Sequence, residues 1–357
     1  MTLIFVGGLV TTTESGMAVP DWPTTFGYGM FSFPVNQWLG NGWELFIEHG
    51  HRLLGSTVGI ITIIYLLALF RWDKRRWMWT LGVLTLAAVI FQGILGGTRV
   101  IENARTLAMV HGCFAPVFLS LCISNAVFTS RRWGQAFTAD CIAAAKEKRR
   151  VLASPLPSAQ GNAFVFAVCA LVGVAYLQII LGAQLRHLPA DASAVMGFNL
   201  AIWHIVIAAT LILLAVGVGI AARRIYRAVD NSARKEGRHM AGVRKSAHWV
   251  SLLLFVQILL GCGTWLLNYG WPSWFAGTEA AERFVIVSQD FWQTFVTTTH
   301  QTAGSLILAS CVAMLWRAVA ANSGLLNDLA KDRPRRSLAK YTATGMAPSP
   351  LVNGGAS

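Results

Sequence analysis

The chain alternates between long apolar runs and shorter polar segments. Seven runs carry almost no charge, and each is long enough as a helix to cross a hydrocarbon core of about 30 Å. They cover residues 50–70, 77–98, 106–128, 162–185, 197–222, 248–268 and 294–316. Because only helices and closed barrels span a membrane, and runs of this length suit helices, the pattern predicts an all-α integral membrane protein.

An eighth apolar run, Met1–Val10, has only about half of the length that a span needs. It lacks the basic start and the cleavage site of a signal peptide. We interpret it as the outer end of a first helix that is truncated in this chain, as a misplaced start codon would leave it. The predicted architecture is therefore eight transmembrane helices with both chain ends inside.

Lysine and arginine fix the orientation of these helices. The segments 71–76, 129–151, 223–247 and 317–340 hold 24 of the 29 basic residues. By the positive-inside rule these segments are cytoplasmic. The net charge of +13 is thus a signal of topology, with membrane lipids as partners and no nucleic acid. A hydrophobic content of 55% and a charged content of 13% also exclude an ordinary soluble protein.

A repeated element divides the chain into two similar halves. We expect an N-terminal four-helix half over 1–128, a cytoplasmic linker over 129–161, a C-terminal four-helix half over 162–318 and a basic, disordered tail over 319–357. A glutamine four residues before a glycine closes three of the outward-running helices: Gln92 and Gly96, Gln178 and Gly182, Gln257 and Gly261. The pattern predicts a duplicated four-helix bundle, although close helix packing explains the glycines equally well.

Two external loops, 11–47 and 269–293, are rich in aromatic residues. Such loops suit the interface between membrane and water, and they suit equally a cover over a bound ligand.

Four histidines carry the strongest chemical signal. His51, His111, His204 and His300 each lie near the outer start of an inward-running helix, two in each half. Ionisable residues inside a membrane are costly and usually functional. Neutral imidazole binds haem iron, and a pair on two helices can take both axial positions. The pattern therefore predicts two bis-histidine haem sites, with a proton relay or packing as the alternative. We expect His49, His187, His239 and His248 to be solvated or interfacial, with His49 also a candidate neighbour of a ligand.

One carboxylate distinguishes the two halves. Glu48 precedes His51 by three residues, so both lie on one face of a helix, and no other candidate ligand has such a neighbour. A carboxylate beside a haem edge can exchange a proton or stabilise a cation. The alternative is a carboxylate favoured only by the helix dipole. The first interpretation places catalysis in the first half and a permanent cofactor in the second.

Haem propionates need cationic partners. Four external arginines lie next to helix ends close to the histidine layer: Arg52, Arg99, Arg105 and Arg186. We predict these as propionate partners, with interfacial snorkelling as an equally good explanation.

Several short motifs occur along residues 1 to about 318 in a fixed order. They are Gly7-Gly8-Leu9-Val10, Ser15-Gly16-Met17-Ala18-Val19-Pro20-Asp21-Trp22-Pro23, Glu48-His49-Gly50-His51-Arg52-Leu53, Gly96-Gly97-Thr98-Arg99-Val100, Val110-His111-Gly112, Trp203-His204 and His300-Gln301-Thr302-Ala303. In these motifs the chain resembles haem A synthase, the membrane enzyme family that converts haem O to haem A for cytochrome oxidase.

The resemblance implies an oxidoreductase that acts on a methyl group. The family oxidises the C8 methyl of haem O by two hydroxylations, through an alcohol to a gem-diol that loses water to give the formyl group. It implies that His51 and His111 hold the substrate haem, that Glu48 serves catalysis, and that His204 and His300 hold a haem b cofactor that passes electrons.

The resemblance also implies a setting. It places the chain in the inner (cell) membrane, with the histidine layer near the periplasmic face. Haem O, haem O synthase (a farnesyltransferase) and cytochrome oxidase assembly factors are the implied partners, and a homo-oligomer stays open.

The cysteines place the chain in a subgroup. None of the six lies in an external loop and none forms a Cys-x-x-Cys pair, which argues against an external disulfide or a thiolate metal cluster. Some bacterial members carry a cysteine pair in the first external loop, so this chain is more similar to the Cys-less alphaproteobacterial and mitochondrial members.

Two rival functions use the same four ligands. One is a di-haem electron-transfer subunit of the cytochrome b type, and the other is a haem transporter or chaperone. Glu48 and the long aromatic loops favour the enzyme. A farnesyltransferase is disfavoured, because no aspartate-rich pair lies at the end of a membrane helix.

Overall fold

The protein is described by a computed structural model over residues 1–130, 133, 158–189, 191–230, 237–271 and 287–322. Within these residues it is helical, and seven helices are long and apolar enough to cross a membrane. The helices are α1 (Thr2–Thr12), α2 (Val35–Gly40), α3 (Trp43–Trp72), α4 (Arg76–Ile101), α5 (Arg105–Thr129), α7 (Ser158–Arg186), α8 (Ala194–Asp230), α9 (Gly237–Tyr269) and α11 (Phe291–Ala321), with a 3-10 turn η1 at Ser15–Met17. The predicted fold class, an all-α multi-pass membrane protein, is confirmed.

The helices extend beyond the apolar runs that predicted them. The run 50–70 lies inside α3, which begins at Trp43, and the run 197–222 lies inside α8, which ends at Asp230. Hydropathy detects only the part of a helix that fits the hydrocarbon core, whereas the backbone hydrogen bonds continue into polar sequence at both ends. Most of the predicted linker and nearly all of the predicted tail lie outside the described residues, as does Cys141.

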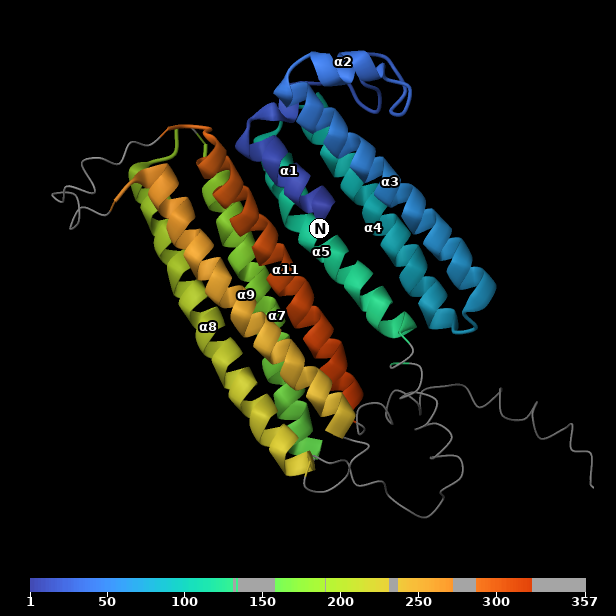
Figure 1. Cartoon of the computed structure of the whole chain (residues 1–357), viewed down its shortest axis with the longest axis vertical. Helices are drawn as coiled ribbons and strands as arrows, with labels where there is room; N and C mark the ends of the chain where they lie inside the picture. The colour runs from blue at the N-terminus through green and yellow to red at the C-terminus, as the bar shows by residue number, and fades with distance from the viewer. Residues whose placement is uncertain (131–132, 134–157, 190, 231–236, 272–286, 323–357) are drawn as a thin grey trace, which may run out of the picture.

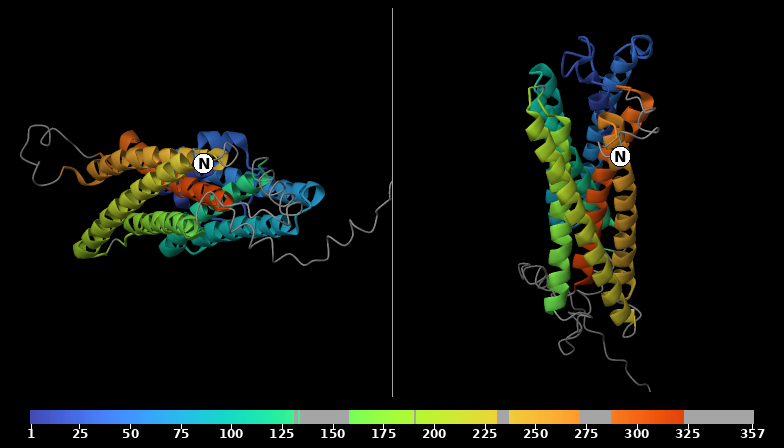
Figure 2. Two further views of the ribbon diagram at one scale, coloured as in Figure 1. Left: turned by 90° about the horizontal axis from the view of Figure 1, so that it is seen from below. Right: turned by 90° about the vertical axis from the view of Figure 1, so that its left-hand side faces the viewer.

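The C-terminal half is a four-helix bundle. In sequence order α7 packs on α8, α8 on α9 and α9 on α11, and α11 returns to pack on α7. Helices α8 and α11 therefore occupy opposite corners (Figures 1 and 2). Side chains that point into the middle of such a bundle from these two helices face one another.

The N-terminal half follows the same order with a shorter first member. Helix α1 packs on α3, α3 on α4 and α4 on α5. Helix α11 joins the halves, since it also packs on α1 and α5 (Figure 1). Arg186 at the end of α7 strengthens this seam, because its guanidinium donates to the Gln301 side chain on α11, to the Gly8 carbonyl on α1 and to the Thr12 hydroxyl.

The tightly buried apolar core lies toward the end of each bundle that is remote from the histidines. In the C-terminal half it spans residues 164–175, 211–222, 243–254 and 307–318 of the four helices. His204 and His300 each lie seven residues outside this core along their helices. In the N-terminal half, Leu69, Met78 and Phe128 form a smaller cluster at the ends of α3, α4 and α5 that are remote from the histidines. The opposite end of each bundle thus holds the histidines instead of a packed apolar core.

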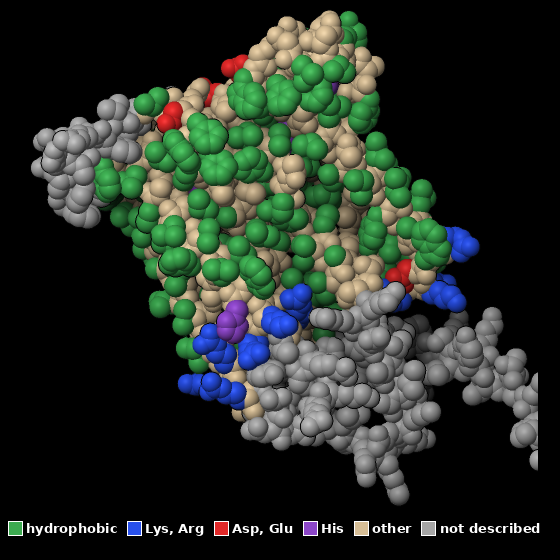
Figure 3. All heavy atoms as spheres, in the orientation of Figure 1, with side chains coloured by type: hydrophobic (Ala, Val, Ile, Leu, Met, Phe, Trp, Pro, Cys, Tyr) green, Lys and Arg blue, Asp and Glu red, His purple; other side chains and the backbone are tan. Residues whose placement is uncertain are grey.

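The molecular surface fits a membrane. Apolar side chains cover the middle of the face in Figure 3, whereas its lysines and arginines gather toward the lower end. Large side chains such as Ile60, Ile64 and Leu67 on α3 and Leu213 on α8 are exposed along the helices. Exposed apolar side chains along uncharged helices are expected where lipid is the solvent.

Candidate functional site

The structure pairs the four predicted histidines within each half. His51 on α3 lies near His111 on α5, with 6.4 Å between ring centroids and 81° between the ring planes. His204 on α8 lies near His300 on α11, again with 6.4 Å between centroids and with an angle of 61°. The two sites therefore share one spacing, although they come from different parts of the chain.

This spacing fits one metal ion between each pair of rings. Imidazole nitrogens bind first-row metals at about 2 Å, so two such bonds and the two ring radii separate the centroids by about 6 Å. The described residues contain no group of three or more His, Cys, Asp or Glu side chains able to hold a metal ion. Two axial nitrogens are what haem iron requires, because the porphyrin supplies its other ligands.

The ring nitrogens of the four histidines have different surroundings. The Nδ1 atoms of His51, His204 and His300 are buried without a direct hydrogen bond among the described residues, although the main chain of Leu3 lies close to the His51 ring and that of Gln257 close to the His300 ring. His111 differs, because its Nδ1 is 3.1 Å from the carbonyl oxygen of Gln92. A ring that donates from Nδ1 leaves Nε2 to bind a metal or to accept a hydrogen bond, and the Nε2 of His111 lies 3.4 Å from the amide nitrogen of Gln92. The donor set and its surroundings fit a bis-imidazole haem in each half.

A glycine faces each of the four rings from a neighbouring helix. A Cβ atom added at Gly7 would lie 2.8 Å from Cε1 of His51, and one at Gly96 would lie 2.9 Å from Cε1 of His111. At Gly182 and Gly261 the corresponding distances to His204 and His300 are 3.2 and 3.1 Å. The glycines thus make room for the imidazoles. The sequence showed three of these glycines as a repeat, but it did not show that each of them meets a histidine.

The glutamine of the repeat binds the same histidine through the backbone. The Nε2 atoms of Gln92, Gln178 and Gln257 donate to the main-chain carbonyl oxygens of His111, His204 and His300, each over 3.0 Å. Each glutamine therefore ties its own helix to the next one at the level of the ring. The sequence pattern contained this signal as a fixed spacing, but the partner of the glutamine could not be derived from it.

Glu48 lies at the centre of a buried polar network, with only 2% of its surface exposed. Its Oε1 accepts a hydrogen bond from Arg52 at 2.8 Å, and its Oε2 accepts one from the main-chain nitrogen of Val19 at 3.0 Å. Arg52 also donates to the carbonyl oxygens of Val19, Asp21 and Thr24. The ion pair therefore connects the start of α3 with the segment that precedes it.

One of the other histidines differs from the sequence interpretation. His49 is not solvated: it is 2% exposed, its Nδ1 is 3.1 Å from the Thr25 hydroxyl, and its ring packs against Phe33 and Trp38. The preceding aromatic loop folds over α3 and buries it, which periodicity alone does not reveal. His187 is half-buried at the end of α7. Burial and the nearby Arg186, together with the other arginines around it, lower the pKa of His187 to about 4.

Comparison with known families agrees with the motifs. The sequence profile of the COX15-CtaA family, described as a cytochrome oxidase assembly protein, matches residues 1–277. The chain belongs to the COX15-CtaA family. The resemblance to haem A synthase in the sequence motifs is confirmed at the level of the family.

Individual relatives match over shorter stretches of this COX15-CtaA chain. It is 32% identical to the heme A synthase of Shouchella clausii over 113 residues, which are 30% of this chain and 35% of that protein. It is 26% identical to the heme A synthase of Oceanobacillus iheyensis over 132 residues, which are 34% of this chain and 38% of that protein. The matches thus span only about a third of each relative. No solved structure matches the chain.

The structure gives the four predicted propionate partners different surroundings in this COX15-CtaA chain. The terminal nitrogens of Arg52 and Arg186 donate to groups of the protein itself. Arg105 donates to the Leu188 carbonyl oxygen at 2.8 Å. No hydrogen bond of the Arg99 side chain is found among the described residues, although it lies against Gly16, where a Cβ would be 2.5 Å from its Nη1. Arg99 is therefore the best placed of the four to meet an anionic group.

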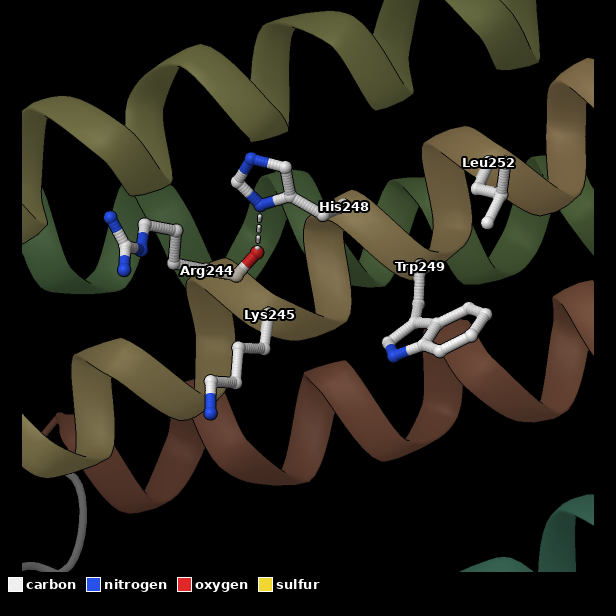
Figure 4. Close-up of a pocket in the computed structure, with 5 residues that line it drawn as sticks. All are labelled: Arg244, Lys245, His248, Trp249 and Leu252. Atoms are coloured by element: carbon white, nitrogen blue, oxygen red, sulfur yellow. Dashed lines mark hydrogen bonds between the residues drawn. The ribbon is translucent and has the colours of Figure 1, made fainter.

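A separate cavity of about 410 Å³ lies at the other end of the molecule, along α9. Figure 4 shows the residues that line it: Arg244, Lys245, His248, Trp249 and Leu252. His248 is exposed, and its Nε2 is 3.1 Å from the Arg223 side chain. This cavity lies at the basic end of the helices and is remote from the histidine pairs.

Proposed function

We propose that this chain is a haem A synthase, which oxidises the C8 methyl of haem O to a formyl group by successive hydroxylations. The observation that carries the proposal is an asymmetry between two otherwise matching sites. Both histidine pairs have a centroid spacing of 6.4 Å, but a buried carboxylate, Glu48, lies one helical turn from a ring in the first half only. Family membership and the two relatives named heme A synthase support the same reaction.

The first half is proposed to bind the substrate. His51 and His111 would hold the iron of haem O between α3 and α5, with Gly7 and Gly96 leaving room for the rings. Arg99 would meet a propionate, since its side chain has no hydrogen bond to the described protein and lies beside the outer segment. These contacts would fix the macrocycle by its iron and by its carboxylate edge, so that its methyl group lies in a constant position.

Glu48 is proposed to accept a proton or to stabilise positive charge that develops during the reaction. With water as the source of oxygen, each hydroxylation replaces a C–H bond of the methyl group by a C–O bond and releases two protons and two electrons, and the electrons would leave through the haem of the second half to a two-electron acceptor in the membrane. The hydrogen bonds from Arg52 and the Val19 nitrogen hold both carboxylate oxygens in a fixed position, from which Glu48 would accept a proton or stabilise a developing cation. The folded segment above α3 excludes water from this side, because Val19, Phe33 and Leu45 are buried together there.

The second half is proposed to hold the cofactor. His204 and His300 would bind haem b, which would pass electrons away from the substrate site when it is bound. Gln178 and Gln257 hold the two histidine backbones, and a rigid pair of ligands suits a haem that is kept. The chain is proposed to work in the inner membrane, with the histidine layer on the periplasmic side and with the cytochrome oxidase assembly machinery as its setting.

The experiment is to express the chain in a host that makes haem O and to analyse the extracted haems by chromatography and mass spectrometry. Haem A or its hydroxylated intermediate is the expected product. A variant with Glu48→Gln keeps the size of the side chain and one acceptor oxygen, which suffices for the bond from the Val19 nitrogen, but it removes the charge and the acceptor for Arg52, so it is the matched variant. Unchanged haem O beside a normal bis-histidine spectrum would favour an electron-transfer subunit or a haem carrier instead.

A further inference from the structure

Three of the four histidines are held by the same pair of contacts. A glycine faces the ring, and the glutamine four residues earlier donates to the histidine carbonyl over 3.0 Å. The Oε1 atoms of all three glutamines are buried without a hydrogen-bond partner among the described residues, so each glutamine bears a desolvation cost in the same orientation. A cost that occurs three times at matching positions points to a shared role in positioning the histidine.

The consequence of the contact is mechanical. The hydrogen bond joins the backbone of the histidine helix to the neighbouring helix at the level of the ring. A shift or rotation of the histidine away from the bundle axis would break this bond and leave a buried amide donor without a partner, which costs about 1–3 kcal/mol in proteins. The hydrogen bond therefore fixes the position of the histidine along the bundle and the direction of its side chain before any metal is bound.

The fourth histidine has the glycine but lacks the glutamine. Gly7 faces His51 at 2.8 Å, as Gly96 faces His111 at 2.9 Å. Four residues before Gly7, however, stands Leu3, where the other three helices carry glutamine. A leucine side chain cannot donate a hydrogen bond. His51 thus faces a glycine, as the other three histidines do, but no glutamine side chain donates a hydrogen bond to its main-chain carbonyl.

We propose that His51 is the exchangeable axial ligand of the two sites, and that Gln92, Gln178 and Gln257 are positioning residues that keep His111, His204 and His300 in place. The inference rests on the proposed function, since it assumes that the four histidines bind haem. It identifies the face of the first-half haem toward His51 as the one where a small exogenous ligand reaches the iron. The haem in the second half stays closed on both faces.

The test uses carbon monoxide as the probe and the purified full chain with its bound haems. Ferrous haem binds carbon monoxide only where an axial position opens, so absorption spectra report exchange without any turnover. The native protein is expected to bind carbon monoxide at one haem of the two. Leu3→Gln is expected to weaken this binding about fivefold, the effect of one net hydrogen bond. Ile4→Gln places the same amide one residue further along α1 and is the matched control, expected to bind as the native chain does.

A second experiment removes one of the glutamines that hold a histidine in place. Gln257→Leu is expected to let carbon monoxide reach the second haem, while the spectrum in the absence of the gas keeps its bis-histidine form. Carbon monoxide binding that responds equally to Leu3→Gln and Ile4→Gln would overturn the inference, as would native protein in which neither haem or both haems bind the gas. The absence of any bis-histidine spectrum would instead refute the proposed function, and this inference with it.

Discussion

Glu48 accepts a hydrogen bond from the main-chain nitrogen of Val19, with 3.0 Å between Oε2 and nitrogen. Val19 itself is fully buried, and it packs with Phe33 and Leu45. One carboxylate therefore has two consequences. It places a negative charge one turn from His51, and it fastens the external segment over the same end of α3.

These two roles can be separated at Glu48. We expect Glu48→Ala to abolish formation of haem A, because the charge beside the substrate site is lost, while the haem b spectrum stays largely intact. Glu48→Gln should retain the hydrogen bond to Val19 and yet lose at least about tenfold in rate, as expected when a charge-stabilising group is neutralised. Product haems are measured by chromatography. A Glu48→Gln chain with native activity would leave Glu48 only the role of fastening the segment.

His204 tests the assignment of the second half. His204→Ala removes one axial ligand of the proposed haem b, so we expect the purified variant to lose that haem and to retain haem in the first half. The measurement is the haem content per chain by the pyridine haemochrome spectrum, with Trp203→Phe as a neighbouring control. Loss of the first-half haem instead, or no loss at all, would refute the division of roles between the halves.

The glycines that face the rings predict a graded effect of added methyl groups. Gly96→Ala would put a Cβ 2.9 Å from the His111 ring, whereas Gly182→Ala would put one 3.2 Å from the His204 ring. Overpacking of this kind costs about 1–3 kcal/mol where the neighbour cannot move, so the first substitution should reduce haem occupancy more than the second. Gly59→Ala, where no atom lies within 4 Å of the added Cβ, is the control. Equal occupancy in all three variants would contradict the packing argument.

Asp21 predicts how the external segment responds to acid. Burial opposes ionisation of Asp21, but hydrogen bonds from the Gly27 nitrogen, the Thr24 hydroxyl and the Phe26 nitrogen outweigh it and lower its pKa to about 2 from an ordinary value of 3.8. Because the folded pKa lies below the unfolded one, the stabilisation is complete above about pH 4 and is lost as the pH falls toward 2. Limited proteolysis within residues 20–42 should therefore accelerate over this interval. Asp21→Asn should be cleaved faster already at neutral pH, and a native rate of cleavage in that variant would contradict the argument.

Much of the fold and of the candidate site followed from the sequence. Uncharged runs such as 106–128 predict membrane helices because lipid demands an apolar surface, and basic segments order them across the membrane. The pairing of His51 with His111 and of His204 with His300 followed from equal depth and from the repeat. The depth of a residue in the membrane and the order of the helices both follow from position along the chain, so they can be predicted from the sequence.

The contacts between helices did not follow from the sequence. The glycine and glutamine of the repeat were visible, but a spacing along one helix does not say which residue of the next helix it meets. Equally, Arg52 and Arg186 were predicted to meet propionates, whereas the structure shows their terminal nitrogens donating to Val19, Gly8 and other groups of the protein. Their role toward a propionate stays a prediction. His49 was misjudged because the fold of the loop that buries it depends on tertiary contacts.

The most direct test of the central claim is the mass analysis of haems extracted from cells that make haem O and express this chain. The account predicts haem A or its hydroxylated precursor with the native chain, and haem O alone with Glu48→Ala. Haem O that stays unchanged in the presence of a correctly folded, haem-loaded native chain would contradict it.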